Sequence, residues 1–347
     1  LNTRCLGRRH RKIGVRVRRG VSRADTKVVC NGGPAMTFAS SEASAIVAMG
    51  EAMVEFNAAR ADALDSYVRG FGGDTSNMAI AAARLGARAG YVSRVGNDAF
   101  GRELLRLWAD EGVDTRGVAT DPVAPTGVYF VTHGPGGHDF SYLRAGSAAS
   151  RIEPATLPLD VIRGAGVLHV SGISQAISTS ACDAVFAAIE AAVAAGARIS
   201  YDPNLRLKLW PLPRARAVIR ATAAQCDWFL PSLDDVRTLS DLADPMAILD
   251  WCHGLGASVV ALKCGRDGAI VSDGHRVERI AGHRVDAVDA TGAGDCFDGA
   301  FVTRMLTGDE PIAAARYANA AAALATTGFG AVAPLPRDAD VRALLAA

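Results

Sequence analysis

From about residue 44 onward, short and almost continuously apolar runs alternate with alanine-rich stretches of helical spacing. Such runs are typical of strands in a sheet covered on both faces, and their alternation with helices indicates βαβ units. We therefore predict an α/β fold: a doubly wound, mostly parallel sheet with helices on both faces. The expected strands are 44–49, 89–95, 166–172, 198–202, 227–231 and 258–263, and the expected helices are 75–86, 99–111, 178–195, 213–224 and 244–254.

Two segments depart from this pattern. Residues 52–71 and 126–146 alternate polar and apolar side chains, as strands with one solvated face do. Gly134, Pro135, Gly136 and Gly137 mark a turn inside the second segment. We predict that the two segments form a small antiparallel β-sheet, which acts as a lid and excludes water from the reaction.

The charge of the chain is unevenly distributed. Residues 1–35 hold ten Arg or Lys and one acid, a local net charge of +9, which leaves −8 for the rest. We interpret residues 1–43 as a basic extension that is disordered, or untranslated with Met36 as the start, and residues 44–347 as the functional domain. A nucleic-acid arm or an arginine-rich transit segment are the alternatives. The acidic body makes nucleic acid an unlikely partner.

The remaining composition excludes several classes of protein. Seven cysteines form no C-x-x-C pair, which predicts reduced thiols in a cytoplasmic protein. The seven histidines show no metal-binding spacing, and no apolar run approaches the ~18 residues of a membrane helix. We expect a cytoplasmic protein without a membrane partner.

The segment DAVDATGAGDCFDGAF, residues 286–301, places Gly292, Ala293 and Gly294 where a helix begins. The first N–H groups of a helix lack partners and the dipole there is positive, so an anion such as phosphate is the expected occupant. Asp295 then lies in the first turn, where we expect the positive environment to keep it ionised and able to accept a hydroxyl proton. The alternative is a structural turn with an Asp cap. The segment matches neither a Walker A loop nor a Rossmann fingerprint.

A second glycine cluster opens another helix. Gly72 and Gly73 precede Asp74 and Asn77, whose polar groups share one helical face. This arrangement predicts a pocket that hydrogen-bonds a polyhydroxylated ligand. Local capping by Asp74 or Thr75 is the alternative.

Together the two clusters resemble the signatures of the ribokinase-like (PfkB) carbohydrate kinase family. The N-terminal signature is similar to GGDTSN at 72–77, continued by RLG and RVGNDAFG, and the C-terminal one to DATGAGD at 289–295. The resemblance spans about residues 44–337 and implies that Asp295 is the catalytic base. It also implies that the N–H groups of Gly292, Ala293 and Gly294 form an anion hole for the transferring phosphoryl.

Within that family, stretches such as SYLRAGSAAS (141–150) and DPNLRLKLWP (202–211) resemble 2-keto-3-deoxygluconate kinases. The resemblance implies that Tyr129, Tyr142, Arg144 and Arg206 surround a sugar acid, with Gly72, Gly73, Asp74 and Asn77 also binding substrate. Arginine suits a carboxylate because its planar fork donates two parallel hydrogen bonds. Arg144 could instead be a solvated lid residue, Arg206 a cap or ion-pair partner, and the two tyrosines packing residues of the lid.

The resemblance also implies an ATP site and metal sites. Its nucleotide-binding residues are Asn204, Lys263, Gly265, Gly268 and Asn319, although residues 264–268 also fit a hairpin turn. Asp235 is implied in holding Mg²⁺ through water, with Asp where relatives often have Glu, and Ser232 where they often have Asn. Asp289 resembles the acid beside a monovalent-cation loop, which would take K⁺.

We therefore expect ATP-dependent, Mg²⁺-assisted phosphorylation of the primary C6 hydroxyl of 2-keto-3-deoxy-D-gluconate by a homo-oligomeric sugar kinase. The product is 2-keto-3-deoxy-6-phosphogluconate. Alternatives are a fructokinase or other neutral-sugar kinase, a nucleoside kinase of the same fold, and a non-catalytic sugar-acid sensor or binding protein.

Overall fold

The computed structural model describes residues 45–60, 63–134 and 137–347, so the basic extension lies outside the described residues. A nine-stranded sheet runs through this part of the chain in the order β13-β12-β11-β10-β9-β8-β1-β4-β5. The strands from β11 to β5 pair in parallel, and β12 and β13 add an antiparallel edge. The bounds are β1 Ile46–Met49, β4 Ala89–Gly96, β5 Asp114–Asp121, β8 Val167–Ser171, β9 Arg198–Asp202, β10 Trp228–Phe229, β11 Val259–Lys263, β12 Ala269–Ser272 and β13 Val277–Ile280.

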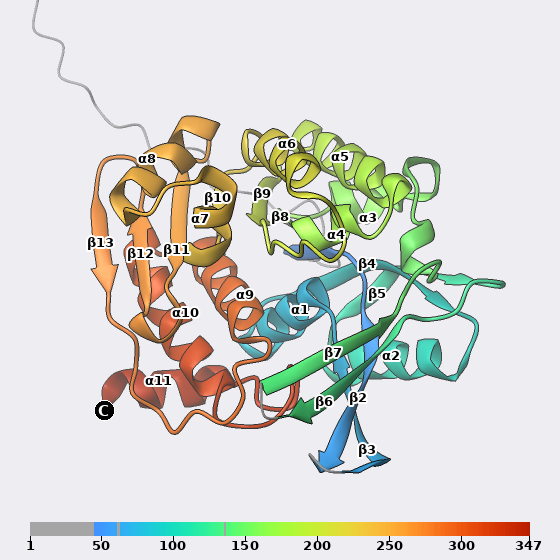
Figure 1. Cartoon of the computed structure of the whole chain (residues 1–347). Coiled ribbons are helices and arrows are strands. Elements are labelled where there is room, and N and C mark those ends of the chain that lie inside the picture. The colour runs from blue at the N-terminus through green and yellow to red at the C-terminus, as the bar shows by residue number, and fades with distance from the viewer. Residues whose placement is uncertain (1–44, 61–62, 135–136) are drawn as a thin grey trace, which may run out of the picture. The chain divides into compact units, whose positions relative to one another are not determined.

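Helices cover both faces of this sheet, and each face has its own apolar core (Figure 1). One core includes Trp108, Phe297 and Phe301 and receives α1 Asp74–Arg84, α2 Ala99–Asp110, α9 Ala293–Leu306, α10 Pro311–Ala325 and α11 Asp338–Ala346. The other includes Tyr201 and Phe229 and receives α3 Leu159–Arg163, α5 Thr179–Ala194, α6 Leu212–Ala223, α7 Leu233–Ser240 and α8 Pro245–Leu255. The short α4, Gly172–Ala176, follows β8. The predicted α/β class is confirmed, and each expected strand and helix corresponds to an observed element.

The two amphipathic segments form a separate four-stranded sheet, in the order β3-β2-β6-β7. Its strands are β2 Met53–Arg60, β3 Ala63–Gly72, β6 Val128–Gly134 and β7 Gly137–Leu143, drawn in blue and green (Figure 1). The β2–β3 and β6–β7 pairs are antiparallel, but the central β2–β6 pair is parallel, so the sheet is mixed rather than wholly antiparallel.

None of the helices in the described residues has the length and apolar character that crossing a bilayer requires. The cysteines in this part of the chain, from Cys182 onward, are free thiols.

Candidate active site

A cavity of about 1290 Å³ opens where the parallel strands of the large sheet end, and β2, β3, β6 and β7 of the small sheet contribute to its wall. The carboxyl ends of parallel strands are the usual position for a ligand in such folds. Most of the predicted site residues line it together: Gly72, Gly73, Asp74, Asn77, Tyr129, Tyr142, Arg144, Asn204, Arg206, Asp235, Lys263, Gly265, Asp289, Gly292, Ala293, Gly294 and Asp295.

Helix α9 begins at this cavity without a side-chain cap. Its N-cap is Gly292, whose φ of 78° lies in the left-handed region that favours glycine. A Cβ at Gly292 would also lie 2.9 Å from the carbonyl oxygen of Ala331. No side chain accepts from the first turn. The N–H of Ala293 donates to the carbonyl oxygen of Ala290 at 3.2 Å, so an anion from the cavity would meet the other N–H groups of this turn first.

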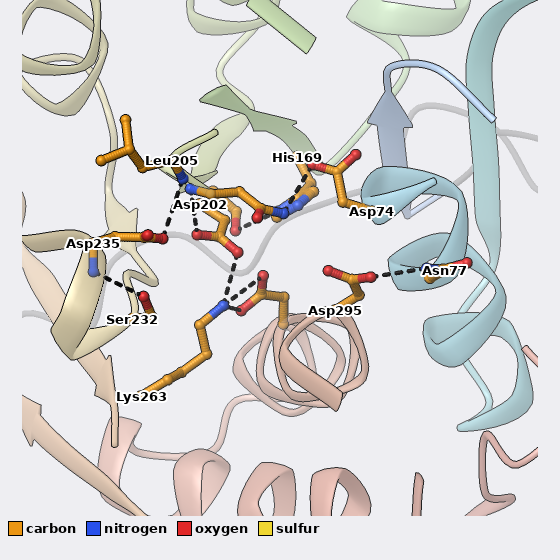
Figure 2. Close-up of polar contacts among 12 residues, drawn as sticks. Asp74, Asn77, His169, Asp202, Leu205, Ser232, Asp235, Lys263 and Asp295 are labelled. Atoms are coloured by element: carbon orange, nitrogen blue, oxygen red, sulfur yellow. Dashed lines mark hydrogen bonds and ion pairs between the residues drawn. The ribbon is translucent and has the colours of Figure 1, made fainter. Parts of the chain in front are cut away.

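Asp295 lies in that first turn, and Asn77 from α1 holds it. The Asn77 Nδ2 donates to Asp295 Oδ2 at 2.8 Å, which joins the two glycine-started helices at one point (Figure 2). Residues that are 218 positions apart in the chain therefore meet at the base.

The helix start at 74 is not side-chain capped, so the capping alternative for Asp74 and Thr75 is wrong.

The pKa of Asp295 is raised to about 7, chiefly by burial and then by the charge of Asp74. The hydrogen bond from Asn77 and the charge of Lys263 oppose this rise but do not cancel it. The expectation that a positive environment keeps Asp295 fully ionised is therefore wrong, because burial and a neighbouring carboxylate outweigh it. A carboxylate with a pKa near the working pH is suited to accept and release a proton.

Two hydrogen-bond acceptors beside Asp295 are unused. Asp74 Oδ1 and Asn77 Oδ1 are buried and have no hydrogen-bond partner among the described residues. The other oxygen of Asp74, Oδ2, accepts a hydrogen bond from Asn204 Nδ2 at 3.1 Å. Buried acceptors without donors are costly, and hydroxyl groups of a ligand would satisfy them.

Lys263, implied in nucleotide binding, is instead bonded to two aspartates. Its Nζ donates to Asp202 Oδ2 at 2.8 Å and to both oxygens of Asp298, at 2.9 and 3.1 Å (Figure 2). Burial alone would lower the pKa of Lys263, but the two carboxylates outweigh it and raise that pKa above its ordinary value. Lys263 thus remains a cation inside the wall of the cavity.

The two tyrosines on the small sheet face each other across the β6–β7 pair. Tyr129 and Tyr142 stack with ring centroids 5.7 Å apart. Tyr129 is buried, and its hydroxyl donates to the carboxylate of Glu55. Tyr142 is 41% exposed, so it has an open face toward the cavity. Tyr129 fits the packing alternative, whereas Tyr142 is free to meet a ligand.

The two predicted arginines are in different electrostatic states. Arg144 is ion-paired with Glu51, a fully buried carboxylate at the end of β1 that also accepts from Ser147. Arg206 is exposed, makes no ion pair within the described residues, and donates to the carbonyl of Leu205 at 2.9 Å. Arg144 therefore has a direct ion-pair partner, whereas Arg206 acts on Asp74 and Asp235 at longer range, where its charge opposes the rise in their pKa values. Neither alternative predicted for Arg206, a cap or an ion pair, is seen.

The remaining predicted residues fall into two groups. Asn204, Asp235 and Asp289 lie at the cavity but are engaged in loop contacts: Asn204 with Asp74, Asp235 with the backbone N–H of Leu205, and Asp289 with Thr291 and the N–H of Gly330. Gly268 and Asn319 do not line the cavity.

Gly268 and Asn319 both contact the backbone at the end of β13. Gly268 has a φ of 95°, and a Cβ there would lie 2.1 Å from the Ile280 carbonyl oxygen. Asn319 Nδ2 donates to the carbonyl of Ala281 at 3.1 Å. Both residues hold the end of β13 against its neighbours. Residues 264–268 connect the antiparallel strands β11 and β12, as the hairpin alternative predicts.

Comparison with known proteins agrees with this geometry. The family model described as pfkB family carbohydrate kinase matches residues 43–338. The chain belongs to the pfkB family of carbohydrate kinases. It is 35% identical over 309 residues to a 2-dehydro-3-deoxygluconokinase of Bacillus subtilis (strain 168), covering 87% of this chain and 95% of that protein.

Two further relatives cover similar shares of the chain. A fructokinase-2 of Solanum habrochaites is 34% identical over 325 residues, 88% of this chain and 97% of the relative. An E. coli protein solved with ATP and Mg²⁺ and described as a ribokinase II superposes with a TM-score of 0.82 at 29% identity, covering 87% and 99%. The two curated relatives named here differ by one percentage point in identity, so the comparisons establish a carbohydrate kinase and leave its sugar open.

Three carboxylates of this carbohydrate kinase were not predicted as site residues. Glu51 pairs with Arg144, and Asp202 and Asp298 hold Lys263. Asp202 ends β9 and Asp298 follows Asp295 by three residues on α9, so strand ends and the i, i+3 helical spacing were available signals. Glu51 follows β1 in the same way, but nothing local to it points to Arg144, 93 residues later.

Proposed function

We propose that this kinase transfers the γ-phosphoryl group of ATP to the C6 hydroxyl of 2-keto-3-deoxy-D-gluconate, giving 2-keto-3-deoxy-6-phosphogluconate. The observation that carries the proposal is the position of Asp295. It lies at the uncapped start of α9, in contact with Asn77, with a pKa of about 7. This arrangement places a proton acceptor next to backbone donors for an anion.

The reaction needs positioning and charge stabilisation more than covalent help from the protein. In our proposal the N–H groups of Gly292 and Gly294 bind the equatorial oxygens of the moving phosphoryl group, and that of Ala293 joins them by leaving the carbonyl of Ala290. Asp295 accepts the proton of the attacking hydroxyl. Asn77 keeps the Asp295 carboxylate in one orientation through its 2.8 Å hydrogen bond.

The acceptors next to Asp295 support a polyhydroxylated substrate. Asp74 Oδ1 and Asn77 Oδ1 are buried without hydrogen-bond partners, and sugar hydroxyl groups can donate to both. The exposed guanidinium of Arg206 makes no direct ion pair among the described residues, and the carboxylate of a sugar acid would supply one. Tyr142 adds an exposed aromatic face on the same cavity.

The side of the cavity that holds Asp235 suits a Mg²⁺ ion that is bound jointly by the protein and the phosphates of the nucleotide. No group of three or more His, Cys, Asp or Glu side chains in the described part of the chain is placed to hold a metal ion alone. Mg²⁺ in kinases is often bound by one or two carboxylates plus phosphates and water. Burial and then the charge of Asp202 raise the pKa of Asp235, while the charge of Arg206 lowers it, and a cation bound there would favour the ionised carboxylate further. Asp235 would hold the ion, and the ion when bound would neutralise phosphate charge.

The nearby Asp289 gives less support for K⁺. Its two oxygens accept from the N–H and hydroxyl of Thr291 and from the N–H of Gly330. These bonds tie the loop before α9 to the loop after α10. They account for the carboxylate without a cation, so K⁺ binding stays a prediction.

A lid role for the small sheet and a kinase domain at residues 44–347 belong to the same proposal. Met53 on β2, Tyr129 on β6 and Tyr142 on β7 line the cavity. Movement of the small sheet would therefore open or close the cavity. Homo-oligomer formation and a cytoplasmic location stay predictions.

Fructokinase activity is the second candidate, and one observation favours it. The charge of Arg144 is already matched by Glu51, so only one of the two predicted arginines has a charge to offer a sugar acid. A neutral sugar would need neither arginine as a carboxylate partner.

A substrate panel tests the proposal directly. ADP release is measured with MgATP and either 2-keto-3-deoxygluconate or fructose, and the phosphorylated carbon is identified by ³¹P–¹H NMR. We expect kcat/KM to be at least tenfold higher for the sugar acid, with phosphate on C6. A preference for fructose would favour the second candidate. Calorimetric binding of the sugar acid without any ADP release would leave the sensor interpretation in place.

A further inference from the structure

Lys263 ends strand β11 and lies next to the first turn of α9. A Cβ built on Gly294 would meet only one atom within 4 Å, the Lys263 Nζ, at 3.6 Å. The backbone of Lys263 is fixed as well, because its N–H donates to the carbonyl of Pro231 at 2.8 Å. The ammonium group is therefore held close to the segment that carries the base.

All the hydrogen-bonding capacity of this ammonium group is in use. A lysine has three N–H donors and no acceptor. Its three contacts are one oxygen of Asp202 and both oxygens of Asp298, all within 3.1 Å. Both carboxylates are buried. A phosphate oxygen could bind the Lys263 Nζ only by taking the place of one of these three carboxyl oxygens, all of which belong to buried side chains.

Charged groups reach Asp295 from several elements. Asp74 on α1, Asp202 at the end of β9 and the hydroxyl of Tyr129 on β6 lie within electrostatic reach, and Lys263 is the cation that opposes the carboxylates. Asn77 donates to Asp295 but carries no charge. Removing Lys263 would leave the base facing carboxylates alone from α1 and β9.

We propose that Lys263 is a positioning residue for phosphoryl transfer: held by Asp202 and Asp298 beside the start of α9, it sets the charge around Asp295 and does not bind the nucleotide. The inference rests on the proposed role of Asp295 as the base. It replaces the nucleotide-binding role that the family resemblance implies for this lysine.

The proposal has a signed consequence in the pH profile. The base must be ionised to act, so kcat/KM for the sugar falls as pH drops through the pKa of Asp295, which is about 7 in the wild type. Loss of a neighbouring cation disfavours the ionised carboxylate. In Lys263→Met the acid limb should move to higher pH by about one unit, since an opposite charge at close range lowers a carboxylate pKa by about that much or more.

A matched variant separates charge from structural damage. Asp298→Asn disturbs the same cluster but keeps the lysine charge, and its amide oxygen can still accept from Nζ. Its acid limb should stay in place or move to lower pH. If Lys263→Met alone does not fold, Asp298→Asn is compared with the double variant Lys263→Met/Asp298→Asn, which differs only in the lysine. Lys208→Met removes an exposed lysine from the same cavity and should not move the limb.

Two results would overturn the inference. One is an unmoved acid limb in Lys263→Met together with a tenfold or larger rise in KM for MgATP, which would make Lys263 a nucleotide ligand. The other is an upward shift of the limb in Asp298→Asn as large as in Lys263→Met, which would indicate general structural damage. A wild-type profile without an acid limb near pH 7 would instead count against Asp295 as the base, and so against the proposed function itself.

Discussion

The cavity has two walls that are built in different ways. The helix wall consists of Asn77 and residues 292–295, at the starts of α1 and α9, and backbone geometry fixes each of its groups. The arginine wall consists of Tyr129, Tyr142, Arg144 and Arg206, which extend from the small sheet and from the loop after β9. Its side chains are held by partners from elsewhere in the chain, such as Glu51 for Arg144 and Glu55 for Tyr129.

This difference separates chemistry from selectivity. Groups on the helix wall keep their positions whichever sugar is present, because a helix start offers the same N–H groups to any phosphate. On the arginine wall, Arg144 is directly ion-paired with Glu51, whereas Arg206 makes no direct ion pair among the described residues. A change of one partner there could alter the preferred sugar while the transfer chemistry stays the same.

The largest effect is expected from Asp295→Asn, which removes the base and leaves the rest of the helix wall in place. The asparagine oxygen can still accept from Asn77, so kcat should fall by roughly 10²- to 10⁴-fold while KM for ATP changes little. Steady-state kinetics with varied ATP measures both constants.

Stability provides the control for this variant. The folded-state pKa of Asp295 is raised above its ordinary value of 3.8 to about 7, so its ionisation opposes folding once the pH exceeds that range. At pH 8 Asp295→Asn should therefore melt no lower than the wild type. A wild-type kcat in Asp295→Asn would show that Asp295 is not the base and that the helix wall does not supply the proton acceptor.

A smaller effect should distinguish the two arginines. Arg206→Ala removes a guanidinium that makes no direct ion pair among the described residues, so KM for the sugar acid should rise about 10- to 100-fold, as expected for loss of a charged hydrogen bond. KM for fructose should change much less. The measurement is the ratio of the two KM values in the coupled ADP assay.

Arg144→Met serves as the comparison for Arg206→Ala. This change leaves the buried Glu51 without its cation, so the main loss should be stability, on the order of 3 kcal/mol in a denaturant titration. Equal effects of the two variants on sugar-acid KM, with no loss of stability in Arg144→Met, would erase the proposed difference between the arginines.

The helix wall could be predicted from sequence because its signals are local. Each glycine cluster before a helical pattern indicates a helix start that can bind a ligand, with an Asp cap as the alternative. The family resemblance, carried by the same short motifs, implies that Asn77 and Asp295 belong to one site. The order of strands and helices followed from apolar periodicity in the same way. These inferences need no knowledge of distant partners.

The rest depended on long-range contacts that no local pattern reveals. The Glu51–Arg144 pair joins the loop between β1 and β2 to the residue after β7. Lys263 meets Asp202 and Asp298 only after β9, β11 and α9 are packed together. The pKa of Asp295 was misjudged for the same reason, since burial and Asp74 act through the tertiary structure. The parallel β2–β6 pair likewise brings together strands separated by α1 and α2.

The smallest effect compares two glycines within the helix wall itself. Gly292 adopts a left-handed φ and packs against Ala331, whereas Gly294 has ordinary helical backbone and no protein atom closer than 3.6 Å to an added Cβ. Gly292→Ala should therefore lose about 1–2 kcal/mol of stability from the unfavourable backbone conformation. Gly294→Ala should keep or slightly gain stability, because alanine is the better helix former.

Gly294→Ala, the more stable of the two variants, should nevertheless lose activity. If the transferring phosphoryl group lies against the first turn of α9, a methyl group at residue 294 crowds it, and kcat should fall about tenfold although the fold is intact. Thermal melting and kcat measured on the same preparations of both variants separate the two causes. The protein itself gives no steric reason for glycine at residue 294, because the nearest atom to an added Cβ outside the helix is Lys263 Nζ at 3.6 Å. Wild-type kcat in a fully folded Gly294→Ala would therefore mean that the phosphoryl group does not approach this backbone.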